Sequence, residues 1–229
     1  MTELLPLFPL GTVLYPGMVL PLHIFEDRYR QLIQDLLRLP EPREFGVIAI
    51  KEGRETGADG VTSLYEIGCV AELRDVTETD DGEFDIVTIG TDRFRLLSGE
   101  QVSGEQGLDR SQPYLRGHIE RLPDEAGEAG SLTVPAAHAS FRAYLDALVE
   151  QGGATVLIEE LPTDPELLSY VIAAAMIIEL STHQALLAEP DAGHRLAAER
   201  TLLARETAML RATTTRPAPD LTSTPFSPN

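Results

Sequence analysis

The sequence is poor in lysine, cysteine and tryptophan. Lys51 is the only lysine and Cys69 the only cysteine among the 229 residues, and tryptophan is absent. A lone cysteine cannot close an internal disulfide, so the composition does not point to an oxidising compartment. The segment around the lysine reads AIKEG and does not fit the Walker pattern G-x-x-x-x-G-K-[ST]. The chain alone is therefore expected to be neither a P-loop ATPase nor a serine–lysine peptidase, because both chemistries need a suitably placed lysine.

Long apolar runs are also missing. The longest, Val171 to Ile178, is too short to cross a membrane. The amino terminus carries Glu3 and no basic region, which differs from a secretory signal peptide. We therefore expect a cytoplasmic protein.

Basic residues are scarce beside acidic ones. The chain has 18 basic and 37 acidic side chains, which gives a formal net charge of −19. Nucleic acids and anionic membranes are bound by lysine and arginine that displace counterions, so this balance disfavours both as partners. Hydrophobic content of 43% and charged content of 24% are ordinary for a soluble globular protein.

What the first half does contain is a series of short apolar runs separated by turn residues. Strands are expected at Leu4 to Phe8, Met18 to Phe25, Phe45 to Ile50, Tyr65 to Thr79, Phe84 to Ile89 with its continuation Arg93 to Leu97, and Tyr114 to Leu122. Pro6 and Pro9 should restrict the first strand to an edge or bulged position. From Glu26 the apolar period becomes helical, and Asp80-Asp81-Gly82 is a hairpin signal. About six strands and one helix favour a small closed or half-open barrel.

The second half is helical in pattern. Residues 124–134 form an acidic, glycine-containing linker after a barrel domain at 1–123, and a helical bundle is expected at 135–212, followed by a disordered tail at 213–229. The segment Thr163 to Glu166 predicts a capping box before an apolar helix from Leu167 to Leu180, and Asp191 should cap the last helix. Leucines at heptad spacing in that last helix leave a dimer open. The predicted fold class is α+β, with an N-terminal barrel and a C-terminal α-helical bundle.

The proline-rich opening FPLGTVLYPGMVLPLHIFEDRYRQL is followed in order by four further segments. They are PREFGVIAIKEG, EIGCVAEL, GTDRFRLL and LPTDPELLSYVIAAAM, at residues 42–53, 66–73, 90–97 and 161–176. Together these segments resemble the amino-terminal substrate-binding domain of the ATP-dependent Lon protease, a domain that also occurs alone, without a protease. The resemblance covers residues 4 to 211. It implies a stand-alone Lon N-terminal domain protein whose barrel is PUA-like, the pseudouridine-synthase-and-archaeosine-transglycosylase type.

The resemblance implies a non-catalytic module that binds unfolded or partly folded polypeptide, or an adaptor for a protease or chaperone. Such binding needs an exposed apolar patch or an open sheet edge, and the proline-broken opening offers both. The candidate contact residues are Leu14, Tyr15, Met18, Phe25 and Tyr29. The alternative for each of them is that it fills the barrel core.

Two other functions are weighed against polypeptide binding. An RNA-binding module is suggested by other barrels of this type, but it would need a basic groove with stacking aromatics. An uncharacterised hydrolase would need a nucleophile, a base and an orienting group, and no such set emerges. Cys69 lies in an apolar strand and is expected to be inert, while His23 is expected to bond to backbone. The histidines lack ligand spacing, so no metal or cofactor is expected.

Overall fold

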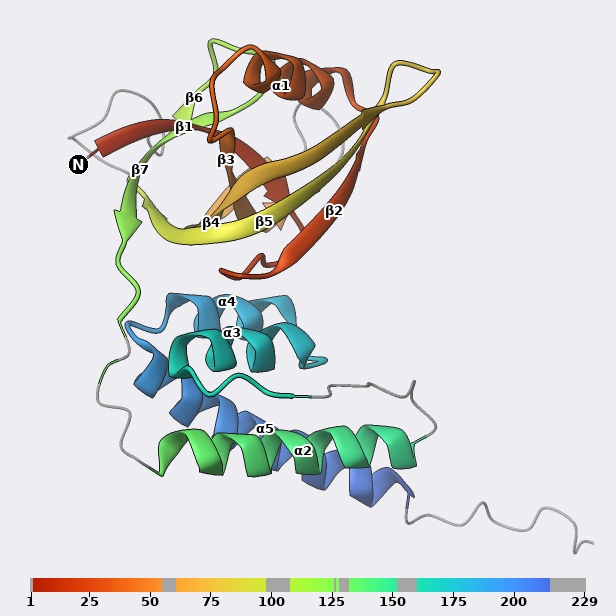
Figure 1. Cartoon of the computed structure of the whole chain (residues 1–229), viewed down its shortest axis with the longest axis vertical. Coiled ribbons are helices and arrows are strands. Elements are labelled where there is room, and N and C mark those ends of the chain that lie inside the picture. The colour runs from red at the N-terminus through yellow and green to blue at the C-terminus, as the bar shows by residue number, and fades with distance from the viewer. Residues whose placement is uncertain are drawn as a thin grey trace, which may run out of the picture.

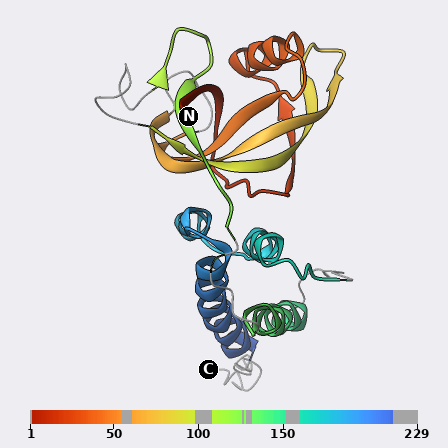
Figure 2. The ribbon, with the colours of Figure 1, turned by 60° about the vertical axis from the view of Figure 1, so that its left-hand side comes forward.

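The chain folds into a β-barrel followed by a helical bundle that lies below it in Figure 1 and in the turned view of Figure 2. The structure is a computed structural model that describes residues 2–54, 61–97, 108–125, 127, 132–151 and 160–214. The predicted α+β class is confirmed. The expected tail lies almost wholly outside the described residues.

Seven strands form one sheet. They are β1 (Thr2–Leu10), β2 (Val19–Ile24), β3 (Glu44–Gly53), β4 (Val61–Glu78), β5 (Phe84–Leu96), β6 (Leu108–Asp109) and β7 (Arg116–Leu122). The hairpin between β4 and β5 is confirmed, with Gly82 at a φ of 74°. Strand β6 was not predicted from the sequence. It has two residues, which are too few to show a periodic pattern.

The barrel closes because β5 pairs with two different strands on the same flank. The sheet order is β2-β5-β4-β3-β1-β7-β6, and the additional β5–β7 pairing closes a ring of five strands. The first half of β5, Phe84 to Ile89, pairs with β2, whereas Arg93 to Leu96 pairs with β7. The strand β2 is therefore attached to the ring by one flank only, among the described strands.

Of the two expected positions for β1, edge or bulged, the edge position is wrong. Residues Thr2 to Pro6 pair with β7, and Leu7 to Leu10 pair with β3, so β1 lies inside the sheet. Each half of β1, however, pairs with a described strand on one flank, the first half with β7 and the second half with β3. A proline nitrogen can face the other flank without costing a ladder hydrogen bond, which explains how Pro6 and Pro9 are tolerated.

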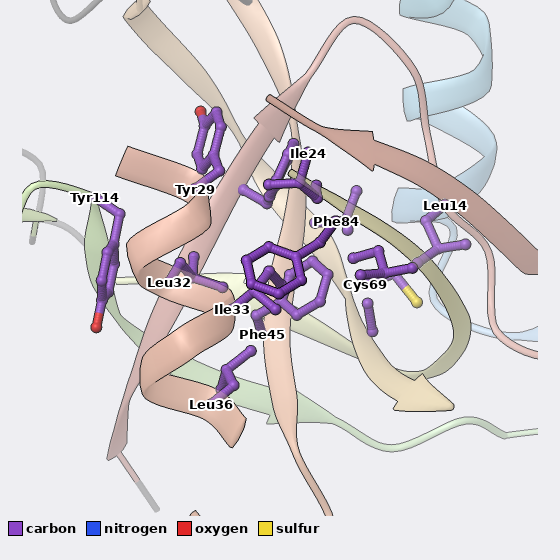
Figure 3. Close-up of a cluster of buried hydrophobic side chains, with 14 residues drawn as sticks. Leu14, Ile24, Tyr29, Leu32, Ile33, Leu36, Phe45, Cys69, Phe84 and Tyr114 are labelled. Carbon is purple, nitrogen blue, oxygen red and sulfur yellow. The ribbon is translucent and has the colours of Figure 1, made fainter. Parts of the chain in front are cut away.

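Helix α1 (Asp27–Leu37) lies over one end of the barrel (Figure 1), and its side chains enter the buried cluster drawn in Figure 3. Its apolar face buries Tyr29, Leu32, Ile33 and Leu36, which meet barrel side chains such as Phe45. The helical spacing of these four residues is the reason that one face of α1 is apolar.

Four helices form the second part: α2 (Thr133–Glu150), α3 (Pro165–Ala175), α4 (Leu180–Ala188) and α5 (Ala192–Thr214). The helix expected from Leu167 to Leu180 ends instead at Ala175, because Met176 is extended and the Ile177 amide donates to the Tyr144 hydroxyl at 3.0 Å. The cap of α3 is Asp164, whose side chain accepts from the Leu167 amide at 2.9 Å.

The core of the bundle is formed by α2, α3 and α5. Leu196 and Leu203 of α5 are buried there beside Phe141 of α2 and Ile172 of α3. The first two leucines of the heptad series therefore pack inside the bundle of the same chain. None of the helices in the described ranges is both long and apolar enough to span a membrane. The domain boundaries stay predictions, with α2 beginning inside the expected linker.

Candidate functional site

The structure places the five predicted contact residues in different environments. Leu14, Tyr15 and Tyr29 are buried, Met18 is half-buried and Phe25 is 52% exposed. Three of the five side chains therefore fill the core and are not available to a partner. The alternation of apolar and polar residues does not predict which side chains are buried in this segment, because prolines interrupt the strand pattern.

Phe25 and Tyr29 meet at a small apolar pocket between the ends of β1 and β2. The pocket has a volume of about 190 Å³, and its lining includes Phe8 and Leu10 of β1 and Leu22 of β2. The Tyr29 ring stacks on Phe8 with ring centroids 4.0 Å apart, which forms the pocket floor from core side chains. Phe25 remains exposed at its margin. The pocket thus offers apolar surface beside a strand that is paired on one flank.

The backbone of β2 presents a regular set of groups along its free flank. The Gly90 amide donates to the Met18 carbonyl at 2.9 Å, and the antiparallel register then continues without a shift from Val19 to Ile24. Bonded and non-bonded pairs alternate in such a ladder, so the backbone groups of Val19, Pro21 and His23 face away from β5. Pro21 has no N–H to offer, which limits pairing on this flank to selected partners.

The close contact between β5 and the turn before β2 fixes the start of this edge. A Cβ atom on Gly90 would lie 2.2 Å from the Tyr15 carbonyl oxygen. Only glycine leaves room for the turn to cross β5 at this point. The position of Met18, and with it the register of β2, therefore depends on that glycine.

His23 lies on the exposed side of β2 between two carboxylates. Its Nδ1 lies 2.8 Å from Asp85 Oδ1 and its Nε2 lies 2.9 Å from Glu83 Oε2. The expectation of a bond to backbone is wrong, because β5 places acidic side chains opposite β2. The hydrogen bond that His23 donates to Asp85 is the largest of the effects that raise the pKa of His23.

Arginine side chains that could have formed a basic groove are engaged with acidic groups. Arg121 contacts Glu3, Glu44 and Asp92 at 3.1, 2.6 and 2.7 Å. Arg28 pairs with Glu26 at 3.0 Å. In these pairs the arginine charges that could bind a phosphate backbone are neutralised, which argues against the hypothesis of RNA binding.

Arg93 joins the barrel to the bundle. It lies on β5, is 2% exposed, and its Nε donates to Asp124 Oδ1 at 2.8 Å. Its Nη1 donates to the carbonyls of Leu187 and Glu189 at 3.0 and 2.5 Å, and Nη2 donates to that of Pro190 at 3.1 Å. A guanidinium at the carboxyl end of α4 satisfies carbonyls that have no partner within the helix. The alternation of apolar and polar residues along β5 did not indicate that Arg93 would bind these carbonyl groups.

A second arginine reaches the same turn from the bundle. Arg195 of α5 donates to the Leu186 carbonyl at 3.0 Å and to Ser169 Oγ at 2.8 Å. Its guanidinium also lies over the Tyr170 ring, 4.1 Å from the centroid. The Tyr170 hydroxyl donates to Asp124 at 2.6 Å, so the two arginines share one network.

Two further hydrogen bonds cross from the barrel to α4. The Tyr15 hydroxyl donates to the carbonyl oxygen of His183 at 3.0 Å, and Gln184 Nε2 donates to the Ile67 carbonyl of β4 at 2.7 Å. Tyr15, expected at a contact surface, therefore acts inside the molecule. These bonds hold α4 against the barrel.

The only thiol of the chain is buried in the barrel (Figure 3). Cys69 lies in β4 with its side chain fully covered, and burial raises the pKa of the thiol. A buried, protonated thiol is a poor nucleophile. Within the described ranges no group of three acidic, histidine or cysteine side chains is arranged to hold a metal ion.

A thiol reagent should therefore react with the native protein very slowly. We expect labelling of Cys69 to be at least ~100-fold slower in buffer than in denaturing urea, because the thiol must become exposed before it reacts. The rates are followed by mass spectrometry, with free cysteine as the control. Similar rates in the two conditions would contradict the buried position.

The comparisons with known proteins agree with this architecture. Residues 4–205 match the family described as the ATP-dependent protease La (LON) substrate-binding domain. Among curated proteins, the chain is 26% identical to Lon protease 2 of Myxococcus xanthus over 215 residues, which are 91% of this chain and 24% of that protein. The chain thus spans about a quarter of the length of the curated relatives it matches.

Two solved structures share the fold. The Lon N-terminal domain protein from Xanthomonas campestris has a TM-score of 0.60 and 23% identity, with 88% of this chain and 98% of that chain covered. The N-terminal domain of the Mycobacterium avium complex Lon protease has a TM-score of 0.62 and 20% identity, with 90% and 98% covered. At these identities the likeness concerns the fold alone.

Proposed function

The chain belongs to the family of ATP-dependent protease La (LON) substrate-binding domains, and from that membership we propose that it is a polypeptide-binding module without catalytic activity of its own. Its ligand is an unfolded or partly folded polypeptide with exposed apolar side chains. An adaptor role towards a separate protease or chaperone is part of the same proposal.

The observation that carries this proposal is the combination of apolar surface and free strand edge at β2. Val19 is 62% exposed and Phe25 is 52% exposed, at opposite ends of the strand. The apolar pocket of about 190 Å³ lies beside its far end. An extended polypeptide can pair with such an edge through its backbone while alternate side chains enter the pocket. Polypeptides of many sequences share that backbone, which suits a substrate-binding module.

The charge of the chain supports a polypeptide ligand over a nucleic acid. The formal charge of −19 repels phosphate, and Arg28, between the pocket residues Glu26 and Tyr29 in sequence, is paired with Glu26. His23 between Asp85 and Glu83 leaves acidic groups beside the β2 edge. Basic and apolar segments are therefore expected to bind better than acidic ones.

The proposal predicts that shortening the exposed side chains of β2 weakens binding. Val19→Ser and Phe25→Ser should each raise the dissociation constant for a labelled, permanently unfolded polypeptide about 3- to 10-fold, because each removes apolar contact area. Fluorescence anisotropy measures the binding. Val149→Ser is the matched control, since Val149 is 48% exposed on α2 of the bundle.

Two further samples complete the test. The folded form of the same polypeptide should not bind, and a single-stranded RNA should not bind either. Equal affinity of wild type and both β2 variants would exclude the β2 edge as the contact. Binding to RNA that falls steeply with added salt would replace the proposal with the nucleic-acid reading.

A further inference from the structure

A second strand edge is free at the junction of the barrel and the bundle. In β4, residues Val61 to Leu64 pair with β3 on one flank, while pairing with β5 begins only at Ile67. On the flank away from β3, the segment Val61–Glu66 has no neighbouring strand among the described residues. Backbone groups of alternate residues on that flank therefore have no strand partner within the described ranges, and a further strand could pair with them.

A groove runs along this edge. Its volume is about 540 Å³, and five consecutive residues of β4, from Ser63 to Ile67, line one side of it. Helix α4 lines the other side with Ser181, Gln184, Ala185 and Ala188. Their spacing of three and four residues puts them on one face of the helix, and their mostly small side chains leave the groove open.

Two buried polar atoms in the groove lack hydrogen-bond partners among the described residues. They are Ser63 Oγ on the strand and Gln184 Oε1 on the helix. Gln184 is 4% exposed, and its Nε2 is fixed by the bond to the Ile67 carbonyl, so Oε1 cannot turn away to solvent without breaking that bond. Buried polar atoms are nearly always paired, so each of these two indicates a missing donor or acceptor.

We propose that this groove binds an extended polypeptide segment, which adds a strand to the free edge of β4 (Val61–Glu66). A peptide backbone carries N–H and C=O groups at every residue, so it can pair with the edge of β4, and its N–H groups are donors of the kind that Gln184 Oε1 lacks. A run of strand residues along one wall fits this ligand better than a compact small molecule, which would need polar groups converging on one point.

The lining also limits which segment fits. Lys51 and Glu66 both reach the groove, so its charge favours neither acidic nor basic side chains. Ala185 and Ala188 leave space for side chains of moderate size. We therefore infer that the ligand is a segment of alternating small or β-branched uncharged residues. This inference rests on the proposed function and adds a second contact, separate from β2.

Hydrogen exchange with a defined peptide tests the second contact. The probe is a short peptide of alternating threonine and valine with arginine at both ends. On binding, amide exchange in residues 61–66 should slow at least ~10-fold, because newly paired amides become protected. The control peptide has N-methyl groups on all of its threonines and valines. Because alternate residues of a strand face opposite flanks, only this complete methylation removes the donors in every register, and the control should give no protection.

Substitutions distinguish peptide binding in the groove from peptide binding at β2. Ala185→Trp fills the groove from an exposed position on α4 and should abolish the protection of residues 61–66. Ala188→Trp is a second variant of the same kind, and circular dichroism checks that both fold. Ala204→Trp is the control, at an exposed position of α5 outside the groove. Protection that survives in Ala204→Trp and Val19→Ser but not in Ala185→Trp supports the inference.

Two results would overturn it. Peptide binding that protects only residues 19–24, and that is unchanged in both groove variants, would remove the β4 site and leave the proposed function intact. Absence of binding to every peptide and unfolded polypeptide would remove both.

Discussion

Replacing Arg93 by methionine is expected to destabilise the protein by about 3–5 kcal/mol, because it breaks an ion pair and also leaves several carbonyl groups without their donor. The guanidinium is 2% exposed and donates to Asp124 and to three carbonyls near the carboxyl end of α4. Methionine keeps much of the side-chain volume but supplies none of these donors. Urea denaturation followed by circular dichroism measures the free energy of unfolding.

The control for this variant lies on the same strand. Arg95→Met makes the same substitution two residues further along β5, where the side chain is exposed. It should change the free energy of unfolding by less than about 0.5 kcal/mol. Equal effects of the two substitutions would show that the contacts of Arg93 do not hold the barrel against the bundle.

A second large effect is expected at Glu199, where the substitution should stabilise. Glu199 of α5 is fully buried, and neither carboxylate oxygen has a hydrogen-bond partner among the residues that the structure describes. Burial raises its pKa from 4.5 to about 9, against the opposing effect of Arg195. The native protein therefore keeps a proton at neutral pH that the unfolded chain releases.

The sign of the pH dependence follows from this difference. Between pH 4.5 and 9 the native state binds more protons than the unfolded state at this site, so its stability falls as the pH rises. Glutamine has the shape of the protonated acid and does not titrate. Glu199→Gln should thus match wild type near pH 4.5 and be more stable at pH 7 by about 3 kcal/mol, from about 1.4 kcal/mol per pH unit over this interval.

Chemical denaturation at several pH values measures this gap. Glu206→Gln is the control on the same helix, where the carboxylate pairs with Arg205 at 2.7 Å at a partly exposed position. Its effect should stay within about 0.5 kcal/mol at every pH. A constant difference between Glu199→Gln and wild type from pH 4.5 to 8 would show that the buried group does not titrate between the two states.

The sequence predicted the parts of the fold that depend on a regular apolar period. Helix α1 was found from the spacing of Tyr29, Leu32, Ile33 and Leu36, and these side chains are buried together. The two-residue strand β6 had no period to detect. The break between α3 and α4 depends on the Tyr144 hydroxyl, which lies far away along the chain, so local apolar pattern could not reveal it.

The candidate site could be predicted less well than the fold. Tyr15 and Phe25 looked alike in sequence, as aromatic residues next to prolines, yet one bonds to His183 inside the molecule and the other is exposed. Nothing in the sequence distinguished Arg93 from Arg95, two residues further along the strand. The role of Arg93 depends on the turn after α4, which lies more than ninety residues away. Only the tertiary structure brings such partners together.

The turn between α4 and α5 receives Arg93 from the barrel and Arg195 from the bundle. Both side chains donate to the Glu189 carbonyl, at 2.5 and 3.4 Å. One carbonyl oxygen thus receives a guanidinium from each part of the molecule, in addition to the bonds of Tyr15 and Gln184 between the barrel and α4. A shift of this turn would therefore disturb the packing of both parts at once.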